Sequence, residues 1–451
     1  MRSLLGRFHR PMSRGLVNNM LTMNNLGDGS TLSLDFTTMG GVLDPRLTFT
    51  RASTVATYIN SSGYVATATT NAPRFDYSPT NIGEPRGLLV EGQGVNLARN
   101  SSTMSSSTYT VQEATLGTGS ANDPSNSVNA PTLTPNIGFS YSSHLIYSTV
   151  GVSNSTAYTL SVYAKANGYN RIGVNIAAGN RYTAVFDLTN GTFVQASSSG
   201  TPTGTSYAIT PIGTNGWYRC SVTMTTADTT LYPHFMVVND GTITFNVNAQ
   251  ATFVGDTSKS IYLWGAQLEL GSGASSYIPT GASQVTRNAE ECRMTGTNFS
   301  SWFAGATEGV FFAEYEKPRK LGSQDYVALS TVYAAGALLN ITTNTGTLWP
   351  SSICWPTGGA LFPGGITTAC PAVTKRAIRW FNGNDFSNFA DGVLGTTSNG
   401  TGTLTMTMLN VGATTNTGTS STADWLNSCI KKIKFYPTAL PNADIQTLTT
   451  T

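Results

Sequence analysis

Apolar and polar residues alternate along much of the chain. In residues 158–164 every second position, from Tyr158 to Ala164, is apolar or aromatic, so these side chains share one face of an extended segment. A period of two is typical of a strand that is buried on one face. A helical period is sustained only in the short stretch 442–448. The pattern therefore predicts antiparallel β-sheets with almost no helix.

Short turn sequences separate the alternating runs. Asn-Gly and Asp-Gly pairs favour the two-residue turns of β-hairpins, because these residues accept positive φ angles. The pairs lie at Asn190-Gly191, Asn215-Gly216, Asp240-Gly241, Asn382-Gly383 and Asp391-Gly392. The apolar aromatic run 309–315 (GVFFAEY) reads as a central strand buried within its sheet.

Changes in composition divide the chain into four parts. A basic arm at 1–30 precedes a loop-rich, charged connector at 31–100. Regular strand patterns then fill 101–287 and, after a Gly/Ser-rich exit, 288–451. We therefore expect an all-β protein with two antiparallel β-sandwiches, preceded by the arm and the connector.

Charge is scarce. Of 451 residues, 25 are Lys or Arg and 23 are Asp or Glu, so 11% are charged, against about 25% in an ordinary globular domain. So little charge argues against solvent-exposed helices. The formal net charge of +2 predicts no generic binding of nucleic acid or anionic membranes. Because no apolar run approaches the roughly 18 residues of a membrane helix, we expect no membrane insertion.

The arm concentrates positive charge before the first acidic residue, Asp28. Its arginines, Arg2, Arg7, Arg10 and Arg14, interrupt every apolar stretch that a secretory signal would need. One interpretation is a frayed, solvated terminus. The other, which we favour, is that the four arginines anchor the protein on an acidic partner surface.

The cysteines give no sign of a zinc or redox site, because they are odd in number, widely spaced and contain no CxxC pair. They are Cys220, Cys292, Cys354, Cys370 and Cys429. Each is most simply a small buried apolar residue. Cys354 and Cys370 flank a Pro/Gly-rich segment, and a disulfide between them is a hypothesis.

The connector gathers both signs of charge in a chain that otherwise has little. We expect these residues to form Arg–carboxylate pairs that hold irregular backbone in place, because the guanidinium group binds carboxylates in a bidentate way. They are Arg51, Arg74, Asp76, Glu84, Arg86 and Glu91.

Long phrases of the sequence resemble structural proteins of tailed bacteriophages. Residues 47–59 (LTFTRASTVATYI), 71–77 (NAPRFDY) and 86–97 (RGLLVEGQGVNL) resemble a module that recurs in phage fibres and spikes. Residues 158–165 and 216–220, with 264–269, are similar to jelly-roll carbohydrate-binding modules, and 309–315, 379–383 and 430–448 resemble the concanavalin A-like, or laminin G-like, lectin fold.

The resemblance implies a virion appendage. Such a protein is assembled in the host cytoplasm, is exposed on the particle surface, and binds a host-surface glycan. The implied partners are capsid, portal or tail proteins, reached through the arm, and the implied assembly is a homotrimer. Two alternatives stay open: a tailspike enzyme that degrades polysaccharide, and a capsid decoration protein without a ligand.

Aromatic residues near Gly, Pro or Asn are the candidate glycan contacts, since an exposed ring offers an apolar face to a sugar. They are Tyr169, Tyr182, Trp349 and Trp355.

A hydrolytic site is not expected. Glu314 and Glu316 alternate onto one face of a predicted strand, but Tyr315 and Lys317 stand where a concanavalin-like hydrolase usually carries a further carboxylate. We read the two glutamates as salt-paired surface residues. The few histidines are isolated and no GxSxG phrase is present. We therefore expect no enzymatic activity, no cofactor and no metal.

Overall fold

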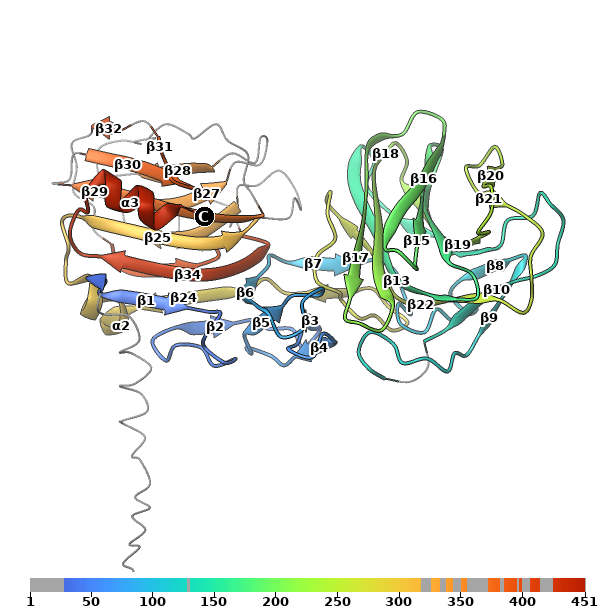
Figure 1. Cartoon of the computed structure of the whole chain (residues 1–451), viewed down its shortest axis with the longest axis horizontal. Coiled ribbons are helices and arrows are strands. Elements are labelled where there is room, and N and C mark those ends of the chain that lie inside the picture. Colours follow the sequence, from blue (N-terminus) through green and yellow to red (C-terminus); the bar gives the residue numbers. More distant parts are fainter. Residues whose placement is uncertain are drawn as a thin grey trace, which may run out of the picture.

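The computed structural model describes residues 28–127, 130–317, 326–332, 338–343, 350–354, 372–381, 385–395, 397–399, 406–413 and 425–450. The chain forms two lobes that lie side by side (Figure 1). The middle of the sequence builds one lobe, here called the central sandwich. Its beginning and end together build the other, here called the terminal sandwich. The predicted all-β fold of antiparallel sandwiches is confirmed.

The central sandwich packs a six-stranded sheet on a seven-stranded sheet. The six-stranded sheet has the order β17 (Thr203–Ile212), β18 (Trp217–Thr226), β13 (Thr156–Asn167), β22 (Ser260–Leu270), β10 (Thr132–Pro135) and β9 (Ala114–Gly117). The other has the order β16 (Thr192–Ser199), β15 (Arg181–Asp187), β14 (Arg171–Ala177), β19 (Thr230–Val238), β11 (Leu145–Tyr147) and β8 (Thr110–Gln112), with β12 (Val150–Gly151) also paired to β19. The alternating apolar residues of both sheets, such as Leu160 and Ile172, meet in one core.

The terminal sandwich also has two sheets. Its nine-stranded sheet has the order β31 (Val393–Leu394), β30 (Asp385–Ala390), β29 (Val373–Phe381), β25 (Gly309–Glu316), β34 (Ser428–Tyr436), β6 (Pro85–Val90) and β5 (Arg74–Tyr77), with β1 (Leu32–Asp35) on β34 and β32 (Ser398–Asn399) on β30. Its six-stranded sheet has the order β2 (Thr48–Thr50), β24 (Glu291–Thr295), β33 (Met408–Val411), β26 (Tyr326–Val332), β27 (Leu338–Thr343) and β28 (Pro350–Cys354). The run at 309–315 is a central buried strand, as predicted.

Two helices flank the terminal sandwich in the described ranges. The predicted terminal helix is present as α3 (Asn442–Thr449). The sequence analysis missed α2 (Gly296–Phe303), which buries Phe299, Trp302 and Phe303. Their spacing of three and four residues is the helical signal that was available. Neither helix has the length and apolar character that a membrane crossing needs.

The segment predicted as a connector belongs to the sheets of the terminal sandwich. Leu32 of β1 faces Phe435, and Leu88 of β6 faces Ile430, so two strands from the beginning of the chain pair with β34 near its end. Gly87 makes the second contact possible. Its φ is 109°, and a Cβ at this position would lie 2.1 Å from the carbonyl oxygen of Ile430. Local sequence predicts such strands but not their distant partners.

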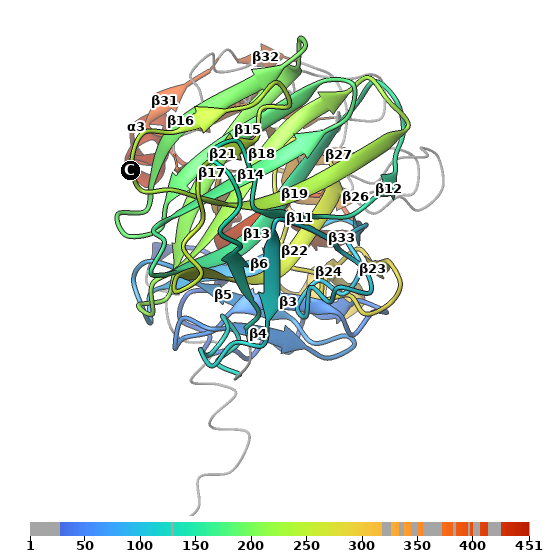
Figure 2. The ribbon, with the colours of Figure 1, turned by 90° about the vertical axis from the view of Figure 1, so that its right-hand side faces the viewer.

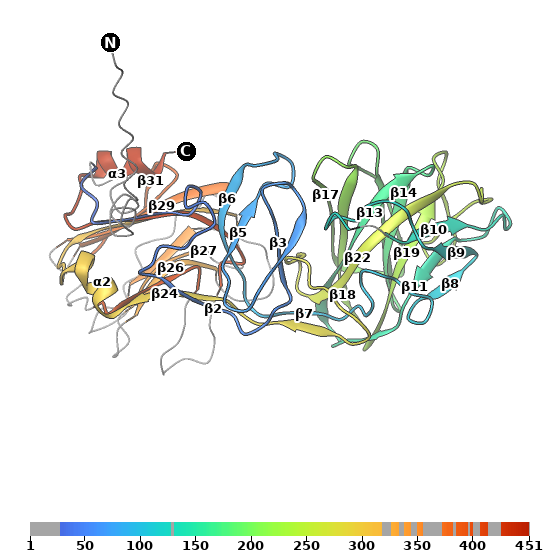
Figure 3. The same ribbon diagram turned by 90° about the horizontal axis from the view of Figure 1, so that it is seen from below.

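The lobes are joined in two places. Where the chain enters and leaves the central sandwich, β7 (Gly94–Asn96) pairs with β23 (Val285–Arg287), and Figure 3 shows β7 running between the lobes. The hairpin of β3 (Ala56–Ile59) and β4 (Val65–Ala68) forms the second contact, where Val65 packs with Tyr163 and Trp217 of the central sandwich. Figure 2 shows this hairpin below the central sandwich. A further hairpin, β20 (Thr244–Phe245) with β21 (Ala251–Thr252), lies on the far side of that lobe.

The cysteine predictions and the predicted turn at Asp391-Gly392 are confirmed, whereas Asp240-Gly241 joins β19 and β20, which do not pair with each other. Asp391 and Gly392 both have positive φ, 49° and 80°, between β30 and β31. Cys220, Cys292 and Cys429 are buried and free. Cys370 and the side chain of Cys354 lie outside the described residues, so their disulfide stays a hypothesis.

Candidate functional site

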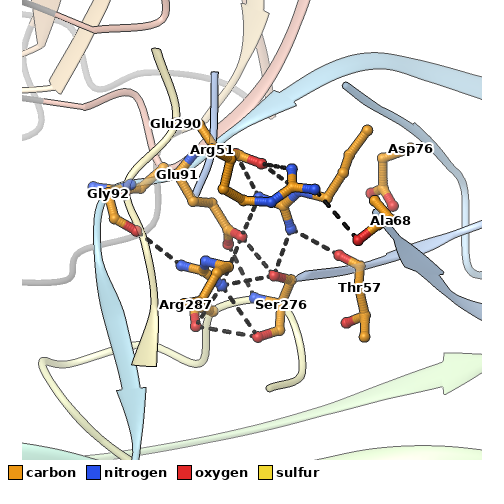
Figure 4. Close-up of polar contacts among 12 residues, drawn as sticks. Arg51, Thr57, Ala68, Asp76, Glu91, Gly92, Ser276, Arg287 and Glu290 are labelled. Atoms are coloured by element: carbon orange, nitrogen blue, oxygen red, sulfur yellow. Dashed lines mark hydrogen bonds and ion pairs between the residues drawn. The ribbon is translucent and has the colours of Figure 1, made fainter. Parts of the chain in front are cut away.

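Five charged side chains meet beside the neck between the lobes. Arg51, Arg74, Arg287, Glu91 and Glu290 have no solvent-exposed side-chain surface. They come from the ends of β2, β5, β6, β23 and β24, and are drawn in Figure 4. We call them the junction cluster. Because charges are buried only when they are paired, the contacts within the cluster decide what it can do.

Glu290 accepts four hydrogen bonds. Its Oε1 accepts from Arg51 Nη1 at 2.8 Å and from Arg74 Nε at 2.7 Å. Its Oε2 accepts from Arg74 Nη2 at 2.5 Å and from the backbone N–H of Glu91 at 2.9 Å. Both oxygens of this carboxylate are therefore occupied by protein donors.

Both carboxylate oxygens of Glu91 are likewise occupied by protein donors. Its Oε2 lies 2.9 Å from Arg74 Nη2, 3.0 Å from Arg287 Nη1 and 2.6 Å from the hydroxyl of Ser276. Its Oε1 accepts the backbone N–H of Ser276 at 2.9 Å. Ser276 follows β22 of the central sandwich, so this carboxylate ties the two lobes together (Figure 4).

The electrostatics agree with a structural role. Burial alone would lower the pKa of Arg74, but the charges of Glu290 and Glu91 outweigh it and raise that pKa. Burial lowers the pKa of Arg51, with partial compensation by Glu290. Guanidinium groups stay charged in proteins. The junction cluster is thus a filled ion network with no carboxylate left to act as an acid or base.

A second group lies nearby, between β5, β6 and β25. Arg86 Nη1 is 2.6 Å from Asp76 Oδ2, and Arg86 Nε lies 3.0 and 2.9 Å from the two carboxylate oxygens of Glu316. Lys431 approaches Glu316 from the other side at 4.0 Å. The interpretation of Glu316 as a salt-paired residue fits these contacts. Glu314 lies on the same strand, opposite Lys375 and Lys432.

Five of the six charged residues predicted as ion pairs lie in these two groups: Arg51, Arg74, Asp76, Arg86 and Glu91. Glu84 is exposed and accepts a hydrogen bond from the Asn81 side chain. The sequence analysis missed Arg287 and Glu290 as partners. Their charge in a charge-poor chain was a signal, but nothing local indicated that they face residues about 200 positions earlier.

A cleft of about 480 Å³ opens next to these ion pairs, between β17 and β18 of the central sandwich and β3, β5 and β6 of the terminal sandwich. Of its 22 lining residues, 11 carry a hydroxyl group. Ile59, Val65 and Ile212 add apolar surface, and Asp76 with Arg86 forms part of one wall. A pocket of this size with few charges and many hydroxyls suits a polar, uncharged small molecule.

Strand register explains the hydroxyl-rich wall. Ser206 of β17 faces Thr223 of β18, and Ala208 faces Ser221. Cross-strand partners share a face, so these side chains line the cleft, while the alternate residues Cys220 and Val222 enter the core. The same alternation that builds the sandwich therefore lays polar side chains along the cleft.

Two predicted glycan contacts are corrected by the structure. Tyr169 is 5% exposed and Tyr182 is 9% exposed, and both belong to the core of the central sandwich. Tyr182 lies in β15 rather than in a loop, where alternation turns it inward. Tyr169 packs edge-on against Phe253, with ring centroids 5.6 Å apart. Neither ring offers the open face that stacking on a sugar requires.

The other predicted contacts fall outside the described residues. They are Arg2, Arg7, Arg10 and Arg14 of the arm, and Trp349 and Trp355. Among the residues that are described, no group of three or more His, Cys, Asp or Glu side chains is placed to hold a metal ion.

No protein-family model matches the sequence, and no curated protein matches it. Among solved structures, the botulinum neurotoxin serotype D binding domain is 10% identical and covers 35% of this chain and 40% of its own, with a TM-score of 0.26. Mouse laminin α1 domains LG4-5 are 9% identical and cover 81% and 94%, with a TM-score of 0.23. Trypanosoma rangeli sialidase in complex with sialic acid is 9% identical and covers 70% and 60%, with a TM-score of 0.27.

The chain spans about two fifths of the length of the botulinum structures that it matches. Likenesses at these scores are too distant to assign an activity.

Proposed function

We propose that this protein is a carbohydrate-binding appendage of a tailed-phage virion, and that the cleft between its lobes holds a host-surface saccharide. The observation that carries the binding proposal is the cleft itself, in which half of the lining residues bear hydroxyls beside apolar side chains. A saccharide presents the matching surface, with hydroxyls at its edges and C–H groups on its faces. The phage role rests on the sequence phrases that resemble fibre and spike proteins.

The walls of the cleft are held apart at a fixed distance. The buried ion pairs of the junction cluster and the packing of Val65 against Tyr163 and Trp217 join the lobes on two sides. A rigid site loses little conformational entropy when a ligand enters, and this favours binding. We therefore expect the ligand to enter without closure of the lobes.

We propose binding without cleavage. Most glycoside hydrolases need two carboxylates, about 5–5.5 Å or 6.5–9.5 Å apart. Asp76 is the single carboxylate among the described lining residues, and it already binds Arg86 and the backbone N–H of Ile59. The tailspike enzyme and the decoration protein without a ligand are the alternatives that experiment must separate.

The binding proposal is tested with a substitution that fills the cleft. Ala208 lies on the exposed edge strand β17 within the cleft, so Ala208→Trp should block entry without disturbing the core. Thr242→Trp, on an exposed loop at the far end of the central sandwich, is the matched control. We expect wild type and the control to bind oligosaccharides released from the host surface, and Ala208→Trp to lose at least about tenfold in affinity, or about 1.4 kcal/mol.

Binding that survives Ala208→Trp would place the site elsewhere. New reducing ends released from the polysaccharide, and lost in the double variant Glu314→Gln with Glu316→Gln, would favour the tailspike enzyme. No binding to any host polysaccharide would favour the decoration protein.

We further propose that the arm attaches the protein to capsid, portal or tail proteins of the particle. Removal of residues 1–25 ends before the first described strand, β1, and should leave both sandwiches folded. We expect the truncated protein to be missing from particles. Particles with normal amounts of it would refute the role of the arm. Because the contacts are ionic, high salt should release the intact protein more readily than mild detergent.

A homotrimer is the proposed assembly. The adjacent edge strands β16 and β17 contain no Lys, Arg, Asp or Glu, so nothing charged protects these edges from pairing. Burial between copies would cover them. Light scattering on residues 31–451 should give a trimer, and a monomer at micromolar concentration would contradict an assembly made by the sandwiches.

A further inference from the structure

The charged groups of the cleft already bind other parts of the protein, and of the three only Arg219 keeps a donor without a partner in the described residues, its buried Nε. Three lining residues are ionisable at neutral pH: Asp76, Arg86 and Arg219. Whether the cleft attracts an acidic or a neutral ligand depends on what these groups bind.

Arg86 lies between two carboxylates. Its Nη1 donates to Asp76, while Nε and Nη2 donate to Glu316 in a bidentate pair. Its side chain is only 20% exposed. An acidic ligand would have to displace one of these carboxylates or lie next to the negative charge of Asp76. Arg86 is therefore no free receptor for an anion.

Arg219 donates hydrogen bonds to two other residues of the protein. Its Nη1 donates to the carbonyl oxygen of Ser275 at 2.6 Å, and its Nη2 donates to the hydroxyl of Ser161 at 3.0 Å. The guanidinium carbon lies 5.3 Å from the ring centre of Tyr163, over its face. The nearby Glu269 is fully buried and interacts with the charge of Arg219.

The charge balance follows from these contacts. Two arginines, Arg86 and Arg219, are matched by Asp76, Glu316 and Glu269. Lys431 also lies 4.0 Å from Glu316, so three cations face three carboxylates. The cleft wall therefore offers no cation without a carboxylate nearby to pair with the carboxylate or sulfate of a ligand.

Hydroxyl groups are what the cleft wall leaves available. The side chains of Ser206, Thr210 and Ser221 make no hydrogen bond within the part of the chain that the structure describes, and Ser206 and Thr210 are exposed. A hydroxyl both donates and accepts, so it can match the hydroxyl of a sugar in either role. From Ser206 to Thr210 the strand extends about 13 Å, at about 3.3 Å per residue. This length suits a short oligosaccharide rather than a single ring.

We propose that the cleft selects an uncharged oligosaccharide, held by the hydroxyls of β17 and β18, and that it discriminates against glycans carrying carboxylate or sulfate. The inference rests on the proposed function of the cleft. It goes beyond that function by naming the class of ligand from the pairing of Arg86 and Arg219.

The experiment compares two matched sets of probes, neutral hexose oligomers and the corresponding hexuronic acid oligomers of equal length, by titration calorimetry at low and physiological salt. We expect wild type to bind at least one neutral series about tenfold more tightly than its acidic counterpart. Thr210→Arg adds a cation without a carboxylate partner. This variant should reduce or reverse the preference for the neutral oligomers, and the effect should be larger at low salt than at physiological salt.

Thr242→Arg places the same charge on the distal loop and should leave the preference of wild type unchanged. If wild type binds the acidic series as tightly as the neutral one, and Ala208→Trp abolishes that binding, the neutral selectivity is wrong while the cleft remains the site. If neither series binds, or if binding is indifferent to Ala208→Trp, the proposed use of the cleft fails and the selectivity fails with it. Circular dichroism of each variant excludes loss of fold as the cause.

Discussion

Replacing Glu290 by glutamine should strongly destabilise the protein. Glu290→Gln keeps the shape of the side chain but removes the charge that faces Arg51 and Arg74. The amide N–H₂ of the glutamine would also face the N–H donors of Arg51 and Arg74, with which it cannot form hydrogen bonds. Breaking one buried ion pair costs about 3–5 kcal/mol, because the remaining charge is left without compensation in a dry site.

The structure places the expected loss near the middle of that range. Glu290 accepts from two guanidinium groups and from a backbone N–H, and its side chain has no exposed surface. Arg74 keeps Glu91 as a partner, and this limits the damage. We therefore expect a loss of about 4 kcal/mol, which lowers the urea midpoint by more than about 1 M at a slope of about 3 kcal/mol/M.

Tryptophan fluorescence during urea unfolding is a suitable assay, since Trp425 Nε1 donates to the carbonyl oxygen of Glu290 at 2.9 Å. Glu316→Gln is the matched control. Its side chain is 15% exposed and its partner Arg86 retains Asp76, so we expect it to cost less than about 2 kcal/mol. Equal losses in the two variants would refute the argument that burial sets the energy of the junction cluster.

Three further results are expected. Burial lowers the pKa of His234 from 6.5 to about 4, so between these pH values the imidazole is protonated in the unfolded chain and neutral in the folded chain. The free energy of unfolding should therefore fall by up to about 3 kcal/mol as the pH drops from 6.5 to 4. His234→Gln should flatten this part of the plot of urea midpoint against pH. Gly87→Ala should push β6 away from β34 and lower the free energy of unfolding by at least about 2 kcal/mol. Gly151→Ala, with open space around its Cβ, should leave that free energy nearly unchanged. Equal urea midpoints in the two variants would contradict this expectation. Because burial raises the pKa of Cys220 and Cys292, neither thiol should react with Ellman's reagent until the protein unfolds, and rapid labelling of native protein would show that the core opens.

Sequence periodicity predicted the fold class because the physics of a half-buried strand is local. The alternation from Tyr158 to Ala164 became the middle of β13, and the aromatic run at 309–315 became β25, between β29 and β34. Turn residues were equally informative, since positive φ is a property of single residues. These features need no knowledge of distant partners.

The parts that sequence analysis missed depend on contacts between remote segments. Residues 31–100 were read as a connector, because nothing in β1 or β6 says that β34 is their partner. The cleft arises for the same reason, since its walls come from β5 and β17 of different lobes. Tyr182 was predicted as a glycan contact because it lies next to Gly- and Asn-containing sequence, whereas the strand alternation of β15 turns its ring inward.

The pairing of β1 with β34 also bears on how the chain is made. Leu32 faces Phe435, and the ribosome adds about 5–20 residues per second, so the partner strand emerges about 20–80 s after β1. During that interval β1 lacks the strand it pairs with, and β6 pairs with β5 alone. The central sandwich is encoded by contiguous residues and is complete well before β34 appears. By closing its neck at β7 and β23 it brings Glu91 beside Arg287, and the early strands are then held close to the place where the last strands will arrive. We therefore expect the central sandwich to serve, during synthesis, as an assembly template for the lobe that surrounds it in the sequence.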